Sequence, residues 1–376
     1  MLGGTMKTGR RTFLKETGIA AAVGALLPAS LDGFAQVPRA QAPTPDVRDA
    51  GMQMCEAYFN GRDEQKMAFC RQMDVLGAVS GVDKAADGKP WELGNVQATV
   101  QAYQKSGLKL RVIEGPPALG DKTKLGLEGR DEEISNFITF MKSLQQAGID
   151  TICYNWMPVI GWYRTDMARP GRGGALMTAF DADAIKDAPM TKYGAVSKEK
   201  LWETLAYFLK AVVPEAEKAG IKLAMHPDDP QVDQVKGISR IMTTVDNFKR
   251  MLAIHPSPNN GITMCQGNFA LMGADIPATI RSFGKEHIHF VHFRNVMGGK
   301  FSFTECFHDE GKIDMYEAMR AYYDIGFRGP VRPDHVPTMY GDSNAHPGYS
   351  VLGCLYANGY QRGLMESVSK ERRHQV

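Results

Sequence analysis

The sequence predicts a single (β/α)8 TIM barrel of the α/β class, and two observations carry this prediction. Eight apolar runs of strand length alternate with longer segments whose apolar residues have helical spacing. A glycine followed by a hydrophobic residue joins several helical segments to the next run, at Gly107, Gly148, Gly220 and Gly326. Glycine just past a helix end can take the left-handed cap conformation, and repeated βα units produce this repeated joint. Eight units in about 320 residues fit one barrel, with a doubly wound open sheet as the alternative.

The expected elements follow the chain in strict alternation. Strands are predicted at residues 52–59, 74–80, 109–114, 150–156, 221–226, 262–265, 288–294 and 329–334. Helices are predicted at residues 61–73, 96–106, 132–147, 197–218, 245–255, 276–283, 315–325 and 351–369. Two long inserts, residues 160–196 and 296–313, follow strands. Because a barrel carries its active-site loops after its strands, we expect both inserts to border the site.

The N-terminus differs in kind from the rest of the chain. Arg10 and Arg11 precede an apolar run at residues 18–27, and small residues follow at positions 33–35. This pattern is typical of a twin-arginine export signal, with an amphipathic or anchoring N-terminus as the alternative. We expect a signal peptide at residues 1–35, a linker rich in Pro, Ala and Gln at residues 36–50, and a catalytic barrel at residues 51–376. The twin-arginine export machinery would then deliver the protein to the periplasm.

Composition and charge exclude several classes of partner. The chain has 376 residues, 43% of them hydrophobic and 23% charged, which is ordinary for a globular protein. Removing residues 1–35 lowers the basic count from 44 to 40 and the acidic count from 42 to 40. A formally neutral chain predicts no nucleic-acid partner. The six cysteines form no CxxC pair, and a protein that folds before export does so in a reducing compartment, so we expect free thiols.

Potential metal ligands stand at the ends of the last four predicted strands. They are His226, Cys265, His292 and Asp334. In a barrel these ends converge on one mouth, so two imidazoles, a thiolate and a carboxylate would meet there. Each residue alone is also compatible with a structural role, but the set predicts a divalent cation. The oxygen and nitrogen ligands favour Mn²⁺, with Fe²⁺ as an alternative, while the thiolate leaves Zn²⁺ open.

Other polar residues lie near the same strand ends. Asp228 and Asp229 either orient His226 or cap a turn. His308, in the insert after the seventh strand, is a candidate substrate contact. His335 follows Asp334 directly, so both can face one site, Asp334 as ligand or base and His335 as proton carrier.

The sequence resembles the mannonate dehydratase family, whose members are metal-dependent sugar-acid lyases of the xylose-isomerase-like barrel group. The matching phrases are HPDDP (226–230), Cys-x-Gly (265–267), FVHFRNV (290–296), FHDEGKIDM (307–315), RPDH (332–335), CYNWMPV (153–159), WYRTD (162–166) and PGY (347–349). The resemblance implies the same four metal ligands named above. It also implies His335 and Tyr349 as the proton-handling residues, and Asn155, Arg164 and Arg294 as substrate contacts.

The resemblance implies a hydro-lyase that removes water from an aldonic acid, D-mannonate or a relative, to give a 2-keto-3-deoxy acid. A base takes the C2 proton and a second group protonates the departing C3 hydroxyl. His335 and Tyr349 would form this pair, with acid and base not assigned between them. Gly161 stands where the family pattern has Asp, and the first strand's end at residues 58–62 matches poorly. Both departures leave the exact sugar acid open.

Two other functions remain as alternatives. The first is an exported metal-dependent sugar isomerase or epimerase, or a keto-glycoside β-elimination lyase, because these reactions also begin with proton abstraction beside a metal-bound oxygen. The second is a sugar-binding protein without turnover, which eight βα units and the set Asp334, His335 and Tyr349 argue against. The expected partner is a small-molecule sugar acid or sugar, and assembly into a homo-oligomer stays open.

Overall fold

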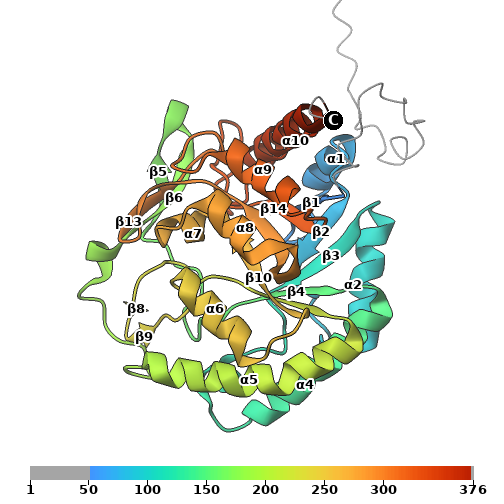
Figure 1. The fold of residues 1–376 in the computed structure, drawn as a ribbon, viewed down its shortest axis with the longest axis vertical. Coiled ribbons are helices and arrows are strands. Elements are labelled where there is room, and N and C mark those ends of the chain that lie inside the picture. The colour runs from blue at the N-terminus through green and yellow to red at the C-terminus, as the bar shows by residue number, and fades with distance from the viewer. Residues whose placement is uncertain (1–50, 374–376) are drawn as a thin grey trace, which may run out of the picture. The chain divides into compact units, whose positions relative to one another are not determined.

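A computed structural model describes residues 51–373 and contains the predicted TIM barrel. Eight parallel strands close in the order β1-β14-β11-β10-β7-β4-β3-β2 (Figure 1). Their bounds are β1 (Gln53–Ala57), β2 (Gly77–Ser80), β3 (Lys109–Glu114), β4 (Thr151–Tyr154), β7 (Lys222–Met225), β10 (Asn260–Cys265), β11 (Ile288–Phe293) and β14 (Pro330–Pro333). Every predicted barrel strand is present, most of them shorter than expected. The predicted signal peptide and linker lie outside the described residues.

Helices surround the barrel, and eight of them correspond to the predicted ones (Figure 1). They are α1 (Glu64–Gln72), α2 (Leu93–Lys105), α4 (Arg130–Ala147), α5 (Lys198–Ala219), α6 (Val245–Ile254), α8 (Ile276–His287), α9 (Met315–Asp324) and α10 (Val351–Arg373). Gly148 and Gly220 cap α4 and α5 with φ of 77° and 64°, the left-handed conformation expected at these joints.

The two long inserts form an extra antiparallel sheet beside the barrel, which the sequence analysis treated as loops. Its strands are β5 (Asp166–Pro170), β6 (Leu176–Asp181), β12 (Val296–Gly299) and β13 (Ser302–Glu305), in the order β12-β13-β6-β5. The pairing of β13 with β6 joins segments more than a hundred residues apart. Local pattern cannot reveal such a pairing, because the paired strands are short and far apart in the sequence.

Smaller elements were also not predicted. They are α3 (Asp121–Leu125), α7 (Gln266–Leu271), β8 (Gln234–Val235), β9 (Ile238–Ser239), and the 3-10 turns η3 (Arg172–Gly174) and η4 (Ala182–Ile185). Within the described residues, no helix is long and apolar enough to cross a membrane.

Side chains fill the barrel, which is therefore not a pore. One buried residue from each of six barrel strands forms a separate apolar cluster, made of Cys55, Val79, Val112, Cys153, Ala224 and Phe290. A larger apolar cluster packs the outer faces of the strands against the helices. Strands buried on both faces read as nearly continuous hydrophobic runs, which is why the sequence revealed them.

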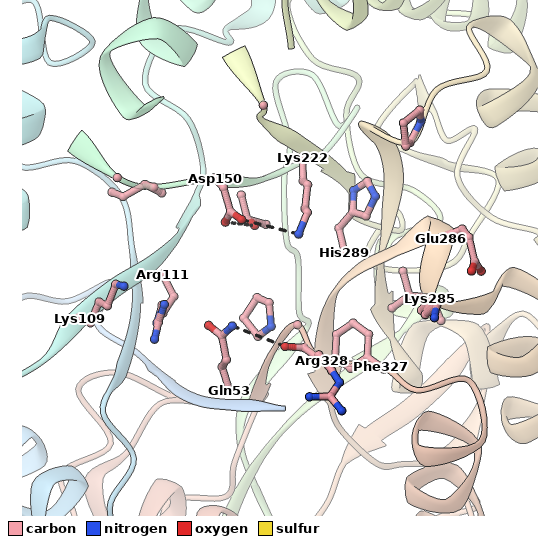
Figure 2. A pocket seen from close by; sticks show the side chains of 18 of the residues that line it. Gln53, Lys109, Arg111, Asp150, Lys222, Lys285, Glu286, His289, Phe327 and Arg328 are labelled. Atoms are coloured by element: carbon pink, nitrogen blue, oxygen red, sulfur yellow. Dashed lines mark hydrogen bonds and ion pairs between the residues drawn. The ribbon is translucent and has the colours of Figure 1, made fainter. Parts of the chain in front are cut away.

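The N-terminal ends of the strands surround a hollow of about 820 Å³ (Figure 2). The charged residues of its lining are mostly basic, among them Lys109, Arg111, Lys285 and Arg328 (Figure 2). Helix ends such as Gly220 also line it, and helix C-termini carry partial negative charge that nearby cations offset. In the part of the chain that the structure describes, the His, Cys, Asp and Glu groups able to hold a metal lie elsewhere. The basic residues of this hollow are called the basic floor of the barrel.

Candidate active site and metal centre

A smaller cavity of about 230 Å³ opens among residues at and beyond the C-terminal ends of the barrel strands. Six residues predicted from the sequence line it, namely Asn155, His226, His292, Asp334, His335 and Tyr349. Each of them stands at the end of a barrel strand or in a loop that follows one. The barrel therefore brings together side chains that are up to almost 200 residues apart, as strand ends in this fold do.

The four predicted metal ligands converge at this cavity. Cys265 on β10 pairs in register with His292 on β11, and the donor atoms of His226, Cys265 and His292 all lie within 4.8 Å of one another. His226 Nε2 is 3.1 Å from His292 Nδ1. Asp334 Oδ2 is 3.5 Å from His292 Nδ1 and 3.8 Å from Cys265 Sγ.

A polar contact on the outer side of each imidazole sets which nitrogen faces the cluster. His226 Nδ1 lies 2.7 Å from the carbonyl oxygen of Pro227, and a carbonyl only accepts, so Nδ1 carries the proton. His292 Nε2 lies 3.3 Å from Glu114 Oε2. Burial raises the pKa of Glu114, but Arg332 and His292 outweigh it and lower this pKa to about 2. His226 Nε2 and His292 Nδ1, the nitrogens on the opposite sides of the two rings, therefore face each other across the cluster.

Cys265 has the environment of a thiolate. Burial alone would raise its pKa, but Arg294 and hydrogen bonds from His226 and His292 lower it to about 5. Arg294 Nη1 and Asn268 Nδ2 lie 3.5 Å and 3.4 Å from Sγ. The thiolate is the form that binds a metal.

The other buried thiols are different. All six cysteines are free and buried, as expected. Cys153 also lines the cavity, but burial and the charge of Glu114 raise its pKa to about 11. Cys153 is therefore a neutral thiol, and its Sγ accepts a hydrogen bond of 3.2 Å from Thr263.

Asp334 is held as a carboxylate by its surroundings. Arg332, fully buried in the barrel, donates to Asp334 Oδ1 at 2.7 Å and to both oxygens of Glu114 at 3.0 Å. Burial raises the pKa of Asp334, but His335, Arg332 and His292 outweigh it and hold this pKa well below its usual range. Oδ1 also accepts from the hydroxyl of Tyr349 at 3.3 Å, so Oδ2 is the oxygen that lies toward His292 and Cys265.

His335 and Tyr349 lie together on the wall of the cavity. Their rings are 5.5 Å apart between centroids and nearly perpendicular. Trp162 packs on the other side of His335, with a centroid distance of 5.3 Å. Burial and the neighbouring Asp334 keep the pKa of Tyr349 well above its usual range. Tyr349 is therefore a protonated hydroxyl beside an imidazole.

A layer of buried ion pairs lies behind His335. Arg164 donates to both oxygens of Asp229 at 2.5 and 2.9 Å, and Arg294 donates to Asp229 Oδ2 at 3.1 Å. Both guanidinium groups also contact Glu305. Arg164 and Arg294 were predicted to contact substrate, but their side chains have no exposed surface and do not line the cavity. In this geometry Arg164 and Arg294 can influence a substrate only through the carboxylates that they bind, Asp229 and Glu305.

His308 is likewise separated from the cavity. Its Nε2 donates to the carbonyl oxygen of Phe293 at 2.6 Å, and its ring stacks on the Phe293 ring. Burial lowers its pKa to about 4, so the ring is neutral. His308, the expected substrate contact, therefore does not line the cavity, because the insert folds back on its own strand.

Several residues of the site were not among those predicted from the sequence. Glu114 ends a predicted strand, so the same convergence argument could have found it. Arg332 precedes Asp334 by two residues, the spacing that places both on one face of a strand. Glu305 and Trp162 lie in the inserts, where no periodic signal marks them. Asp228 accepts main-chain hydrogen bonds from Ile241 and Met242 at 2.7 and 2.8 Å, so its carboxylate holds the segment that follows β9.

Comparisons with known proteins agree with this site. A family model described as D-mannonate dehydratase (UxuA) matches residues 52–192 and 188–375. The chain is 36% identical over 348 residues to a mannonate dehydratase of Streptococcus uberis, covering 85% of this chain and 99% of that protein. It is 35% identical over 347 residues to mannonate dehydratase 2 of Halalkalibacterium halodurans, covering 85% and 100%.

Solved structures show the same relationship. The mannonate dehydratase from Streptococcus suis serotype 2 matches with a TM-score of 0.77 at 32% identity, covering 85% of this chain and 94% of that one. An L-ribulose 3-epimerase matches with a TM-score of 0.56 at 12% identity, a likeness of fold alone. By sequence and by structure, the chain belongs to the D-mannonate dehydratase family.

Proposed function

We propose that this protein is a metal-dependent mannonate dehydratase, which converts D-mannonate to 2-keto-3-deoxygluconate and water. The observation that carries the proposal is the convergence of four metal-capable side chains beside His335 and Tyr349 at the mouth of the barrel. Family membership supplies the substrate, because the relatives covering 85% of the chain carry the name mannonate dehydratase.

The donor set fits a divalent cation. Two imidazoles and a thiol have donor atoms within 4.8 Å of one another, and the carboxylate oxygen Asp334 Oδ2 lies 3.5 Å from His292 Nδ1 and 3.8 Å from Cys265 Sγ. We propose Mn²⁺ as the resident ion, with Fe²⁺ and Zn²⁺ as the alternatives that the thiolate permits. Such a cation, when bound, lowers the free energy of negative charge that develops on the carboxylate of the substrate.

The protein's own groups then handle two protons. The C2 proton beside a carboxylate is weakly acidic, so it needs a positioned base, and the C3 hydroxyl leaves more easily when an acid protonates it. His335 and Tyr349 are the two groups of the cavity wall placed to do this. The hydroxyl of Tyr349 donates a hydrogen bond to Asp334 Oδ1, so the hydroxyl proton of Tyr349 points toward a proposed metal ligand.

Asn155 is the proposed substrate contact. Its Oδ1 accepts from Lys124 Nζ at 3.0 Å and from the main-chain nitrogen of Met157 at 3.1 Å. Both bonds fix the amide so that Nδ2 is the free group, and Asn155 lines the cavity. We propose that this N–H group donates to a hydroxyl of the sugar acid.

The test is product formation by the purified, Mn²⁺-loaded protein. D-mannonate, other aldonates and a panel of keto-sugars are offered, and the 2-keto-3-deoxy acid is measured. We expect the wild type to turn over D-mannonate. We expect Tyr349→Phe to lose this turnover while its amount of bound metal stays unchanged. Turnover of a keto-sugar with no product from any aldonate would instead support an isomerase or epimerase and overturn the proposal.

A further inference from the structure

Glu305 connects the proton-handling side chain to the extra sheet. It is the last residue of β13 and is buried to 2% exposure. Its Oε1 accepts a 2.6 Å hydrogen bond from Nδ1 of His335 and contacts the guanidinium groups of Arg164 and Arg294. Its Oε2 accepts from the hydroxyl of Thr178 on β6. Every oxygen of this carboxylate is therefore used.

We propose that Glu305 is a positioning residue that holds the proton of neutral His335 on Nδ1 and turns the Nε2 lone pair toward the reacting substrate. This inference rests on the proposed function, in which His335 moves a proton. It adds a residue from outside the barrel to the site, and it gives His335 the role of proton acceptor.

The two arginines make Glu305 an acceptor only. Burial raises the pKa of Glu305, but Arg164 and Arg294 outweigh it and lower this pKa to about 2. An ionised carboxylate has no proton to give, so the proton of the bond to His335 belongs to the imidazole. His335 Nε2 then faces the cavity side, 3.6 Å from Asp334 Oδ1.

The backbone does not fix the ring of His335 by itself. His335 has a φ of 46°, a left-handed conformation that is unusual for a residue other than glycine. The rings of Trp162 and Tyr349 confine its plane from two sides. Stacking cannot distinguish one ring nitrogen from the other, whereas the hydrogen bond to Glu305 can.

A simpler role for Glu305 would be to neutralise Arg164 and Arg294. In that case a shorter carboxylate at position 305 would serve equally well, and the tautomer of His335 would not depend on it. The variant Glu305→Asp separates the two roles, because it keeps the negative charge but withdraws it from Nδ1 by one methylene group.

The direct test is the tautomer of His335, read from ¹⁵N spectra of histidine-labelled protein. The protein is loaded with diamagnetic Zn²⁺ and studied at alkaline pH, above the ordinary histidine pKa of about 6.5. The His335→Gln spectrum identifies the His335 signals by their absence. We expect the Nδ1-protonated form in the wild type and a mixture of tautomers in Glu305→Asp. A wild-type His335 protonated on Nε2 overturns the inference, even if Glu305→Asp does not fold.

Kinetics supply the second test. Glu305→Asp is expected to lower kcat by about 10–100-fold, with KM and bound metal unchanged. The control is Thr178→Val, which removes only the hydrogen bond to Glu305 Oε2 and should keep the wild-type kcat. A Glu305→Asp enzyme with wild-type kcat contradicts the positioning role. Absence of turnover by the wild type refutes the proposed function instead, and leaves the tautomer measurement valid.

Discussion

At the scale of single residues, the thiol of Cys265 has a different chemical state from its neighbour Cys153, although both are buried near the same cavity. Positive and hydrogen-bonding groups around Cys265 lower its pKa to about 5, whereas burial raises that of Cys153 to about 11. Only the first is a thiolate at neutral pH, and only a thiolate is a strong metal ligand. A position near the cavity is therefore not enough to make a cysteine a metal ligand, because its pKa must also be lowered.

Replacing Cys265 with Ser should therefore lower the amount of bound Mn²⁺. A serine hydroxyl is neutral at neutral pH and is a weak ligand, so we expect the stoichiometry measured by elemental analysis to fall well below that of the wild type. Cys153→Ser is the matched control and should bind metal normally. Equal stoichiometry in Cys265→Ser and the wild type would remove Cys265 from the ligand set.

The candidate ligands could be predicted because each stands at a strand end, and barrel strand ends converge. The same argument did not extend to Arg164, Arg294 and His308. Their partners, Asp229, Glu305 and the Phe293 carbonyl, are set by how the inserts fold, and sequence spacing carries no information on that.

At the scale of elements, the extra sheet holds the ion-pair layer in place through Phe303. This residue on β13 is 2% exposed, and its ring packs 5.7 Å from Phe180 and 4.8 Å from the guanidinium of Arg164. Through Phe303, the hairpin of β12 and β13 therefore contacts both Phe180 of β6 and Arg164 of the buried ion pairs.

Phe303→Ala is expected to destabilise the protein by roughly 3–5 kcal/mol, the usual cost of truncating a buried phenylalanine. Loss of the ring should also loosen Arg164 and reduce kcat. Phe301→Ala, on the same hairpin but 58% exposed, should change stability by about 0.5 kcal/mol or less. Urea unfolding of both variants measures this difference, and equal losses would show that the hairpin packing does not matter.

The barrel strands were predictable because burial on both faces gives continuous apolar runs, and the helices because glycine caps end them. The extra sheet was not predictable, because its strands pair across the two inserts and alternate little. Strand bounds also shifted, as at residues 52–59, where pairing in the barrel ends at Ala57.

At the scale of the whole molecule, the predicted export signal lies outside the described residues and makes a separate prediction. Replacing Arg10 and Arg11 with lysine should keep the protein in the cytoplasm, because the paired arginines are what the twin-arginine machinery reads. Cell fractionation and detection of the tagged protein measure this. Lys7→Ala, beside the pair, should be exported normally. Periplasmic accumulation of the double-lysine variant would contradict the prediction.

The folded protein also buries two neutral imidazoles that the unfolded chain would protonate in mild acid. Burial and the nearby Lys222 lower the pKa of His289, at the basic floor (Figure 2), to about 4, and burial gives His308 a similar value. Unfolded histidine has a pKa near 6.5. Between pH 6.5 and 4 the unfolded state binds more protons, so stability falls as pH falls through this window.

We therefore expect each buried histidine to remove about 1.4 kcal/mol of stability per pH unit within that window, and nothing further below it. In His289→Gln the free energy of unfolding should fall less steeply with falling pH, since glutamine does not titrate. The cavity at the other end of the barrel should stay intact. Exposed His346→Gln is the control and should leave the slope unchanged. Urea unfolding at several pH values between 4 and 7 measures the slope. An unchanged slope in His289→Gln would mean that His289 is protonated in the folded protein, against the burial that the structure gives it.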